Sequence, residues 1–422
     1  MKNEKYEKIL IKQFEGIYST SKELEYSKEV GTFLSPFEYQ EYLKYKEDRA
    51  MDNDGYLTLL PLKAFNHKCL YYCFGNDLKA ILESYYSFLS SESSFLNNFS
   101  KSFNESRIYS EIEGTLNVEN VPTTRRRLKE LLEEDAPVKD KNDIIIKNMK
   151  AGIDFVNELP DFNKDNLFAL YSILSKGCLD DDDVLKPGDY YRYDGVEIAH
   201  YHGCPCQLID ECMNSLFEYV NDVLYGKNKN MVELTLLPHI CHYYMIYIHP
   251  YFDYNGRTAR MVSYWIYLLS GVHDYPPIVS EAINQTKNKY YNAIELSRDS
   301  HNDLTYFLKY IFGITCDYAI TYQNLECIEK ANKNKGIIVT ETELNYIKKI
   351  LISYDGAFSY SDFLKKCDID MSKQGALKIL NKFIDYGFLI EVKNKSKTKI
   401  FDINKDNIPY LLKSFGYKAN TK

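Results

Sequence analysis

Residues 249–260 read His-Pro-Tyr-Phe-Asp-Tyr-Asn-Gly-Arg-Thr-Ala-Arg, so a base, a carboxylate, an amide, a glycine and two guanidinium groups follow one another closely. His249 can accept the proton of an attacking hydroxyl group. Asp253 can hold Mg²⁺, a hard cation that binds few carboxylates and keeps other positions for phosphate oxygens and water. This combination favours transfer of a nucleotidyl group from a triphosphate to a hydroxyl.

The second half of this segment predicts an anion-binding turn. The amide of Asn255 and the backbone N–H groups of Tyr254, Asn255 and Gly256 can line a phosphate site at a helix start, where the backbone favours negative charge. Arg257 and Arg260 are one helical turn apart, so both guanidinium groups can face the same phosphates.

Two helices are expected to hold this loop. Residues 232–247 carry apolar side chains at helical spacing, and residues 261–270 form a second apolar run of helical length. The pattern therefore predicts a helix, an anion-binding loop and a second helix in that order.

The segment resembles the signature of the Fic family of AMP transferases, His-x-Phe-x-Asp/Glu-Gly-Asn-Gly-Arg-x-x-Arg, and the resemblance extends over residues 105–315. Tyr251 stands where the family has phenylalanine, which keeps an aromatic anchor. Tyr254 stands where the family has the first glycine of Gly-Asn-Gly. Glycine tolerates a positive φ there, whereas tyrosine is strained if the loop needs that geometry, so we expect an altered anion site.

The resemblance implies a mainly α-helical Fic core with a short β-hairpin flap and an enzyme that moves AMP from ATP to a Ser, Thr or Tyr hydroxyl. The expected acceptors are a target protein and the chain itself. His249 is then the catalytic base, and Asp253 the ligand of Mg²⁺ or Mn²⁺. The expected ATP-binding residues are Tyr254, Asn255, Gly256, Arg257 and Arg260.

Residues 188–198 predict the flap, because two β-rich runs flank an Asp194-Gly195 turn. In the Fic family the flap covers the active site and docks a target segment by strand addition. The resemblance assigns the adenine contact to Val196 and an adenine-pocket aromatic to Tyr291. Ordinary hydrophobic packing is the alternative for both residues.

Residues 109–115, Tyr-Ser-Glu-Ile-Glu-Gly-Thr, resemble the inhibitory helix of the family, whose motif is Ser/Thr-x-x-x-Glu-Gly/Asn. We expect this helix near 105–114, with Glu113 as the inhibitory glutamate and Arg260 as its partner. A carboxylate there would occupy the arginine and repel the γ-phosphate. Tyr109 departs from the motif, so leaky inhibition is expected, and an ordinary capped surface helix is the alternative. In some Fic proteins this glutamate also helps water remove AMP, so the dominant direction is left open.

A separate small domain is expected over residues 336–422, after a polar stretch at 330–336. Three helices and two strands are predicted there, at 341–353, 359–368, 372–385, 388–390 and 399–403. This order resembles a winged helix-turn-helix.

DNA contact by this domain is left open against protein docking or dimerisation. Lysines at 393, 395 and 397 in the wing suit phosphates, but the candidate recognition helix offers Lys373, Gln374 and Lys378 and no arginine for base contacts.

Composition limits the remaining possibilities. The chain has 422 residues and a net charge of −8, which disfavours a general affinity for nucleic acid or anionic membranes. It has no apolar run of membrane-spanning length and no signal-peptide core at its start, and its ten cysteines show no paired framework, so a cytoplasmic protein without membrane contact is expected. The predicted division is a helical extension over 1–100, a Fic catalytic domain over 101–330 and the winged helix over 336–422. A homodimer is neither required nor excluded.

Two rival functions follow from the same residues. Tyr254 and the winged helix together suggest a DNA-binding regulator whose Fic core senses a nucleotide. Phosphate or phosphocholine transfer is the second rival, although Gly256 stands where the kinase-like branch of the family carries lysine.

Overall fold

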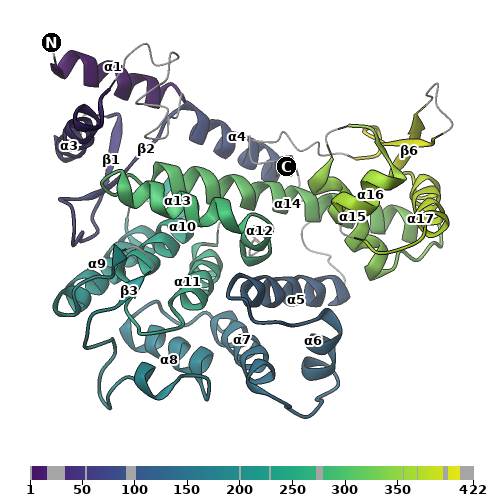
Figure 1. The fold of residues 1–422 in the computed structure, drawn as a ribbon, viewed down its shortest axis with the longest axis horizontal. Coiled ribbons are helices and arrows are strands. Elements are labelled where there is room, and N and C mark those ends of the chain that lie inside the picture. The colour runs from purple at the N-terminus through teal and green to yellow at the C-terminus, as the bar shows by residue number, and fades with distance from the viewer. Residues whose placement is uncertain are drawn as a thin grey trace. The chain divides into compact units, whose positions relative to one another are not determined.

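The computed structural model describes residues 2–16, 34–52, 55–91, 101–198, 201–227, 230–271, 279–354, 356–367, 369–392 and 398–408. The fold is mainly α-helical, as expected (Figure 1). The chain divides into two compact units, Met1–Phe312 and Gly313–Lys422. No helix in these described ranges has both the length and the apolar character needed to cross a bilayer.

The division between the units falls inside helix α14 (Thr305–Lys333), rather than near residue 330. The helix continues into the stretch predicted as a polar linker, and its last turn packs on the C-terminal elements. There the Asn332 amide donates to the Tyr386 carbonyl at 3.2 Å. This contact explains why the helix end belongs to the second unit.

The N-terminal segment holds helices α1 (Lys2–Phe14), α3 (Pro36–Asp52) and α4 (Asn76–Ser91), as expected for a helical extension. It also holds an antiparallel hairpin, β1 (Leu57–Leu60) with β2 (Leu70–Cys73), which the sequence analysis did not anticipate. Strand β2 is buried throughout and forms a parallel bridge from Tyr71 to Asp303, just before α14. The hairpin is therefore attached to the segment that begins α14.

Four helices follow: α5 (Lys101–Val118), α6 (Arg125–Leu132), α7 (Lys141–Asn157) and α8 (Lys164–Ser175). Helix α5 was predicted to end near Gly114, but it continues to Val118. A Cβ at Gly114 would lie 2.5 Å from the backbone nitrogen of Glu281 in helix α12. Gly114 therefore serves close helix packing and does not stop the helix.

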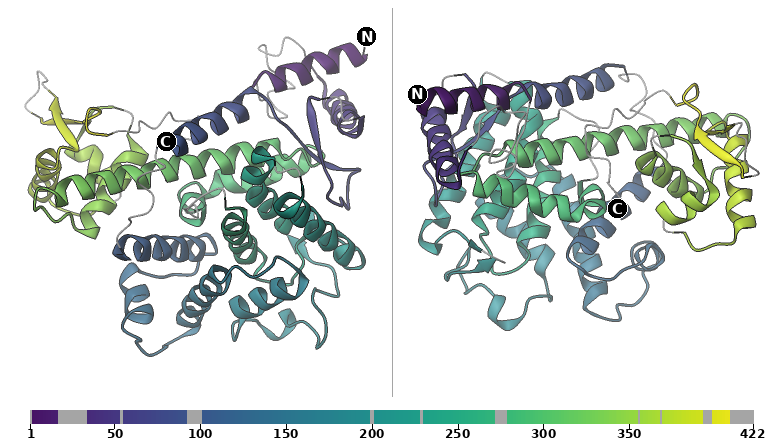
Figure 2. Two further views of the ribbon diagram at one scale, coloured as in Figure 1. Left: turned by 180° about the vertical axis from the view of Figure 1, so that it is seen from behind. Right: turned by 45° about the horizontal axis from the view of Figure 1, so that its top comes forward.

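The remaining helices of the first unit are α9 (Cys206–Tyr225), α10 (Met231–Ile248), α11 (Asn255–Ser270), α12 (Val279–Gln285) and α13 (Lys287–Asp299), after a 3-10 turn, η1 (Asp181–Asp183). Helices α10 and α11 pack together and correspond to the two predicted helices, which are confirmed. Figure 2 shows α5, α7 and α8 grouped around α11, and α11 contacts both α7 and α8. The loop between α10 and α11 is therefore held by buried helices.

The flap is an antiparallel hairpin of β3 (Glu197–Ile198) and β4 (Tyr201–His202), so the predicted turn at Asp194-Gly195 is wrong. Residues 199 and 200, between the two strands, lie outside the described residues. Arg192 explains the difference, because its guanidinium donates to the carbonyls of Asp194, Cys204 and His249. These bonds fix the segment before β3 in an irregular path.

The second unit contains α15 (Glu341–Ser353), β5 (Phe358–Ser359), α16 (Tyr360–Lys366), α17 (Lys373–Asp385), β6 (Leu389–Val392) and β7 (Ile400–Ile403). The three predicted helices and two predicted strands are present, and the short strand β5 completes a sheet of order β5-β7-β6. Thr340 begins α15 with a capping box to Glu343, and Ser372 caps α17. The predicted wing lysines at 393, 395 and 397 lie outside the described residues.

Candidate active site

The loop from His249 to Tyr254 has a left-handed residue at each end. His249 ends α10 with φ 55° and ψ 63°, and Tyr254 precedes α11 with φ 65° and ψ 6°. The His249 N–H still donates to the Met245 carbonyl at 3.0 Å, while the His249 carbonyl accepts from Arg192 Nε at 2.8 Å. The backbone on both sides of the candidate base is thus fixed by hydrogen bonds.

Asn255 closes the loop through its side chain. Its Oδ1 accepts from the Tyr251 N–H at 3.0 Å, and its Nδ2 donates to the Tyr251 carbonyl at 2.8 Å. Tyr251 is fully buried and stacks on Tyr171 with ring centroids 3.7 Å apart. The Asn255 amide therefore holds the loop, and its predicted place at the phosphate site stays a prediction.

His249 is set up to act as a base. Burial lowers the pKa of its imidazole to about 4, which leaves the ring uncharged at neutral pH. An uncharged imidazole can accept a proton from a hydroxyl group, whereas a protonated one cannot.

Asp253 presents a half-exposed carboxylate at the mouth of the loop. Its Oδ1 accepts from the Tyr254 N–H at 2.6 Å, and its Oδ2 lies 3.7 Å from Arg257 Nη2. Asp183 faces the same region, because burial first and the charge of Asp253 next raise the pKa of the Asp183 carboxyl. Asp183 was not predicted to belong to this site. The donor set, one exposed carboxylate beside a second acid, suits a hard divalent cation.

Tyr254 occupies its left-handed position with a buried side chain, only 2% exposed. The Arg257 guanidinium lies over its ring, with Cζ 3.5 Å from the ring centroid. The expected strain at this position is therefore present in the backbone, and the side chain supplies a cation–π contact that glycine could not make.

Arg260 is paired with Glu119. Its Nη2 donates to Glu119 Oε1 at 2.5 Å, and its Nε donates to Thr115 Oγ1 at 2.8 Å. Burial acts to raise the pKa of the Glu119 carboxyl, but the charges of Arg260, Arg257 and Lys287 outweigh burial and lower it. Glu119 is therefore a carboxylate held directly on the second arginine of the loop.

The predicted pairing of Glu113 with Arg260 is wrong. Glu113 lies on another face of α5, with its Oε2 3.8 Å from Arg125 Nη1. Arg125 also donates to Ser110 Oγ and lies over the ring of Tyr109. The residues of the predicted inhibitory motif thus contact Arg125 at the start of α6, and Arg260 pairs with Glu119 instead.

A signal for Glu119 was present in the sequence. Residues 115–120 read Thr-Leu-Asn-Val-Glu-Asn, which fits Ser/Thr-x-x-x-Glu-Gly/Asn without departure. The threonine of this motif is the residue that holds Arg260 Nε. The correct register lies six residues after the predicted one.

Gly256 and Tyr291 lie close to this ion pair. A Cβ at Gly256 would be 2.5 Å from Glu119 Oε1 and 3.3 Å from Arg260 Nη1. Tyr291, on α13, is 43% exposed, and burial first and the charge of Glu119 next raise the pKa of its hydroxyl. Val196 is half-buried just before β3, and its carbonyl accepts from the Gly203 N–H at 3.1 Å.

Comparison with known proteins adds independent information about this region. Residues 161–267 match the sequence profile of the Fic/DOC family. A protein adenylyltransferase Fic from Aedes aegypti is 24% identical over 206 residues, 48% of this chain and 38% of that protein. One from Nematostella vectensis is 31% identical over 125 residues, 30% of this chain and 27% of that protein.

These alignments span well under half the length of the relatives. Among solved structures, a Fic family protein from Desulfovibrio desulfuricans is similar, with a TM-score of 0.49 and 17% identity over 79% of this chain and 97% of that one.

Proposed function

The chain carries a Fic domain, and on this premise we propose that it is a protein adenylyltransferase, which moves AMP from ATP to a Ser, Thr or Tyr hydroxyl of a protein. The observation that carries the proposal is the segment 249–260, where an uncharged, partly buried imidazole at the end of α10 is followed by two buried arginines at the start of α11. Base and phosphate-binding groups are what nucleotidyl transfer requires of an enzyme. The acceptor is a target protein, and the chain itself is a second acceptor.

His249 takes the proton of the attacking hydroxyl. Its ring accepts the proton readily because it is uncharged before the reaction, and the left-handed backbone at the end of α10 fixes its position. Loop amides next to Gly256 and the guanidinium groups of Arg257 and Arg260 bind the phosphate oxygens and stabilise the charge on the leaving pyrophosphate. Val196 of the flap and Tyr291 of α13 contact the adenine.

Asp253, with Asp183 as a neighbouring acid, is the residue that would hold Mg²⁺ or Mn²⁺. When bound, such a cation neutralises charge on the phosphates of ATP. The carboxylate is half-exposed and already oriented by the Tyr254 N–H, so it reaches solvent without a change of the loop.

Glu119 is proposed to inhibit the enzyme in this state. Its carboxylate occupies Arg260, so this arginine cannot bind a γ-phosphate, and its negative charge repels the phosphate oxygens. Productive binding of ATP therefore requires Glu119 to leave Arg260. Because Glu119 lies beyond the end of α5, at Val118, a small movement of this segment is enough.

Removal of AMP from a modified protein uses the same groups. A carboxylate that is freed from Arg260 can take a proton from a water molecule whose oxygen attacks the phosphorus. The bond from phosphorus to the side-chain oxygen breaks, and that oxygen takes a proton from the protonated form of His249.

Transfer from ATP labelled at the α-phosphate tests the proposed reaction. The protein should label an added acceptor or itself, and His249→Ala should lower the rate by about 10² to 10⁴, the usual cost of removing a positioned base. His202→Ala is a matched control, since His202 is an exposed histidine of strand β4. Equal labelling by His249→Ala and the wild type would exclude the proposed mechanism.

A DNA-binding regulator is the second candidate function. The observation in its favour is that Lys373, Gln374 and Lys378 all lie exposed on α17 in the second unit. Such a protein would bind duplex DNA with an affinity that falls steeply with salt and with Lys373→Ala and Lys378→Ala. It would bind ATP without transferring AMP.

A further inference from the structure

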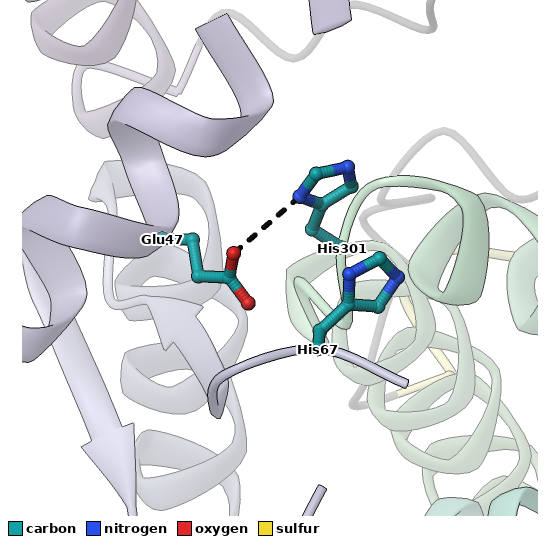
Figure 3. Close-up of side chains that lie close together, drawn as sticks. All are labelled: Glu47, His67 and His301. Carbon is teal, nitrogen blue, oxygen red and sulfur yellow. Dashed lines mark ion pairs between the residues drawn. The ribbon is translucent and has the colours of Figure 1, made fainter. Parts of the chain in front are cut away.

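Three side chains that are far apart in the sequence converge away from the nucleotide site. Glu47 lies on α3, His67 in the loop between β1 and β2, and His301 between α13 and α14. One ligand atom from each lies within 4.8 Å of the other two. Figure 3 shows the carboxylate and the two imidazoles turned toward one another.

The donor types and their spacing suit a metal ion. His301 Nδ1 lies 3.6 Å from Glu47 Oε2, and the rings of His67 and His301 stack with centroids 4.2 Å apart. Two imidazoles and one carboxylate therefore face one another, and both are donor types that zinc takes.

The surrounding contacts hold these side chains in place. The buried Lys46, next to Glu47, pairs with the buried Asp303 at 2.5 Å, which fixes α3 against the segment that carries His301. Glu47 Oε1 also accepts from the Lys68 N–H at 2.5 Å, which fixes the loop that carries His67.

His301 itself adopts a left-handed backbone with φ 56°. Such a conformation in a non-glycine residue is costly and persists only where its surroundings impose it. The ring is partly buried, and its Nδ1 atom has no hydrogen-bond partner among the described residues. An imidazole held in this way is available to a ligand.

We propose that Glu47, His67 and His301 bind one divalent transition-metal ion, with zinc as the best match. Two imidazoles and one carboxylate are zinc ligands, and a fourth position would remain for water. Ligand atoms around tetrahedral zinc lie roughly 3.3 Å apart, and the three atoms here lie within 4.8 Å of one another, so they need to approach by at most about 1.5 Å. The ion would clamp the N-terminal extension onto the helices of the catalytic unit.

Two lysine charges, those of Lys44 and Lys46, act on His301. The charge of Lys46 is offset by its pairing with Asp303. None of the three proposed ligands takes part in the proposed transfer of AMP. The metal site can therefore be tested independently of that activity.

Zinc binding to the full-length, chelator-treated protein tests the site. Zinc affinity is measured by competition with a chromophoric chelator. Excess Mg²⁺ is present so that sites with only oxygen ligands are already filled. Cobalt absorption in the visible range gives the coordination number separately. The ligand variants are Glu47→Gln, His67→Gln and His301→Gln. Their matched controls are Asp48→Asn, the exposed neighbour on α3, and His202→Gln, an exposed histidine elsewhere.

We expect one zinc ion per chain for the wild type and for both controls. Each ligand variant should bind zinc at least about 100-fold more weakly, since changes to residues that only contact a ligand already lower metal affinity about 10- to 100-fold. Zinc should also raise the unfolding temperature of the wild type but not of His67→Gln. Circular dichroism without metal shows whether each variant folds. If His301→Gln does not fold, zinc binding by His67→Gln, a variant of the loop between β1 and β2, tests the site. Equal zinc affinity in the wild type and in folded His67→Gln and Glu47→Gln would overturn the proposal.

Discussion

Tyr254 illustrates a conflict between backbone and side chain at a single residue. Its left-handed backbone disfavours tyrosine by about 1–2 kcal/mol relative to glycine. Its buried ring, stacked under Arg257, contributes more, because truncation of a buried aromatic side chain costs about 3–5 kcal/mol. The stabilisation from burial of the tyrosine ring should therefore exceed the cost of its left-handed backbone.

The prediction is that Tyr254→Gly lowers the free energy of unfolding by about 2 kcal/mol, although it restores the residue usual in the family. Denaturant unfolding of both proteins measures this difference. Higher stability of the glycine variant would show that backbone strain dominates.

His249 gives a second prediction at the residue scale, in its pH dependence. The pKa of its imidazole in the folded protein is about 4, below the ordinary value of 6.5. As pH falls below 6.5, the unfolded chain takes up this proton first, so the contribution of His249 to stability is lost between 6.5 and 4. The neutral base itself is lost only near the folded pKa.

AMP transfer should therefore persist through weakly acidic pH and fall as pH approaches about 4. Stability of the wild type relative to His249→Gln should decline over a higher range, from pH 6.5 downward. Rate profiles and unfolding curves at matched pH separate the two effects. An acid limb of the rate centred near 6.5 would mean that the imidazole is not buried as described.

At the scale of elements, helix α5 decides whether the inhibitory carboxylate is in place. It packs on α12 through Gly114, and Glu119 follows its C-terminal end. Gly114→Ala would place a Cβ 2.5 Å from the Glu281 nitrogen and 2.6 Å from the Ser280 carbonyl carbon, so α5 has to move. This movement should loosen the contact between Glu119 and Arg260.

We expect Gly114→Ala to destabilise the protein by about 1–3 kcal/mol, the usual range for overpacking. We also expect the molecules that remain folded to transfer AMP faster than the wild type. Thermal unfolding and labelling from α-labelled ATP are measured on the same sample. Glu113→Ala, one residue earlier on α5 and half-exposed, serves as the control. Unchanged stability of Gly114→Ala would contradict the packing described here.

Some of these helices and turns could be predicted from the sequence and others could not. The helices of the second unit were predicted almost to the residue, because Thr340 and Ser372 cap them and their apolar faces have helical spacing. The end of α5 and the flap turn were missed. Both are decided by distant partners, the α12 backbone and the carbonyls bound by Arg192, which local patterns do not contain.

At the scale of the whole molecule, the site joins a contiguous loop to a residue far away in the chain. The loop was predictable because its functional residues lie within 249–260. Glu119 was missed because the incomplete motif at 109–114 was chosen over the complete motif at 115–120. The packing of α5 shows that Glu119 contacts Arg260, whereas Glu113 contacts Arg125.

The contact between Glu119 and Arg260 is the central feature of the proposed enzyme. Release of this contact should raise AMP transfer about 10-fold or more, because a hydrogen bond between charged groups is worth about 1.5–3 kcal/mol. Glu113→Gly should change nothing, because Glu113 faces Arg125. The two variants differ only in which glutamate of one segment is removed.

Transfer of label from α-labelled ATP with Mg²⁺ should therefore be compared among the wild type, Glu119→Gly, Glu113→Gly and the double variant Glu119→Gly/His249→Ala. Increased labelling in Glu119→Gly alone, abolished in the double variant, is the predicted result. Increased labelling in Glu113→Gly with wild-type behaviour of Glu119→Gly would contradict the assignment of Glu119 as the inhibitory residue.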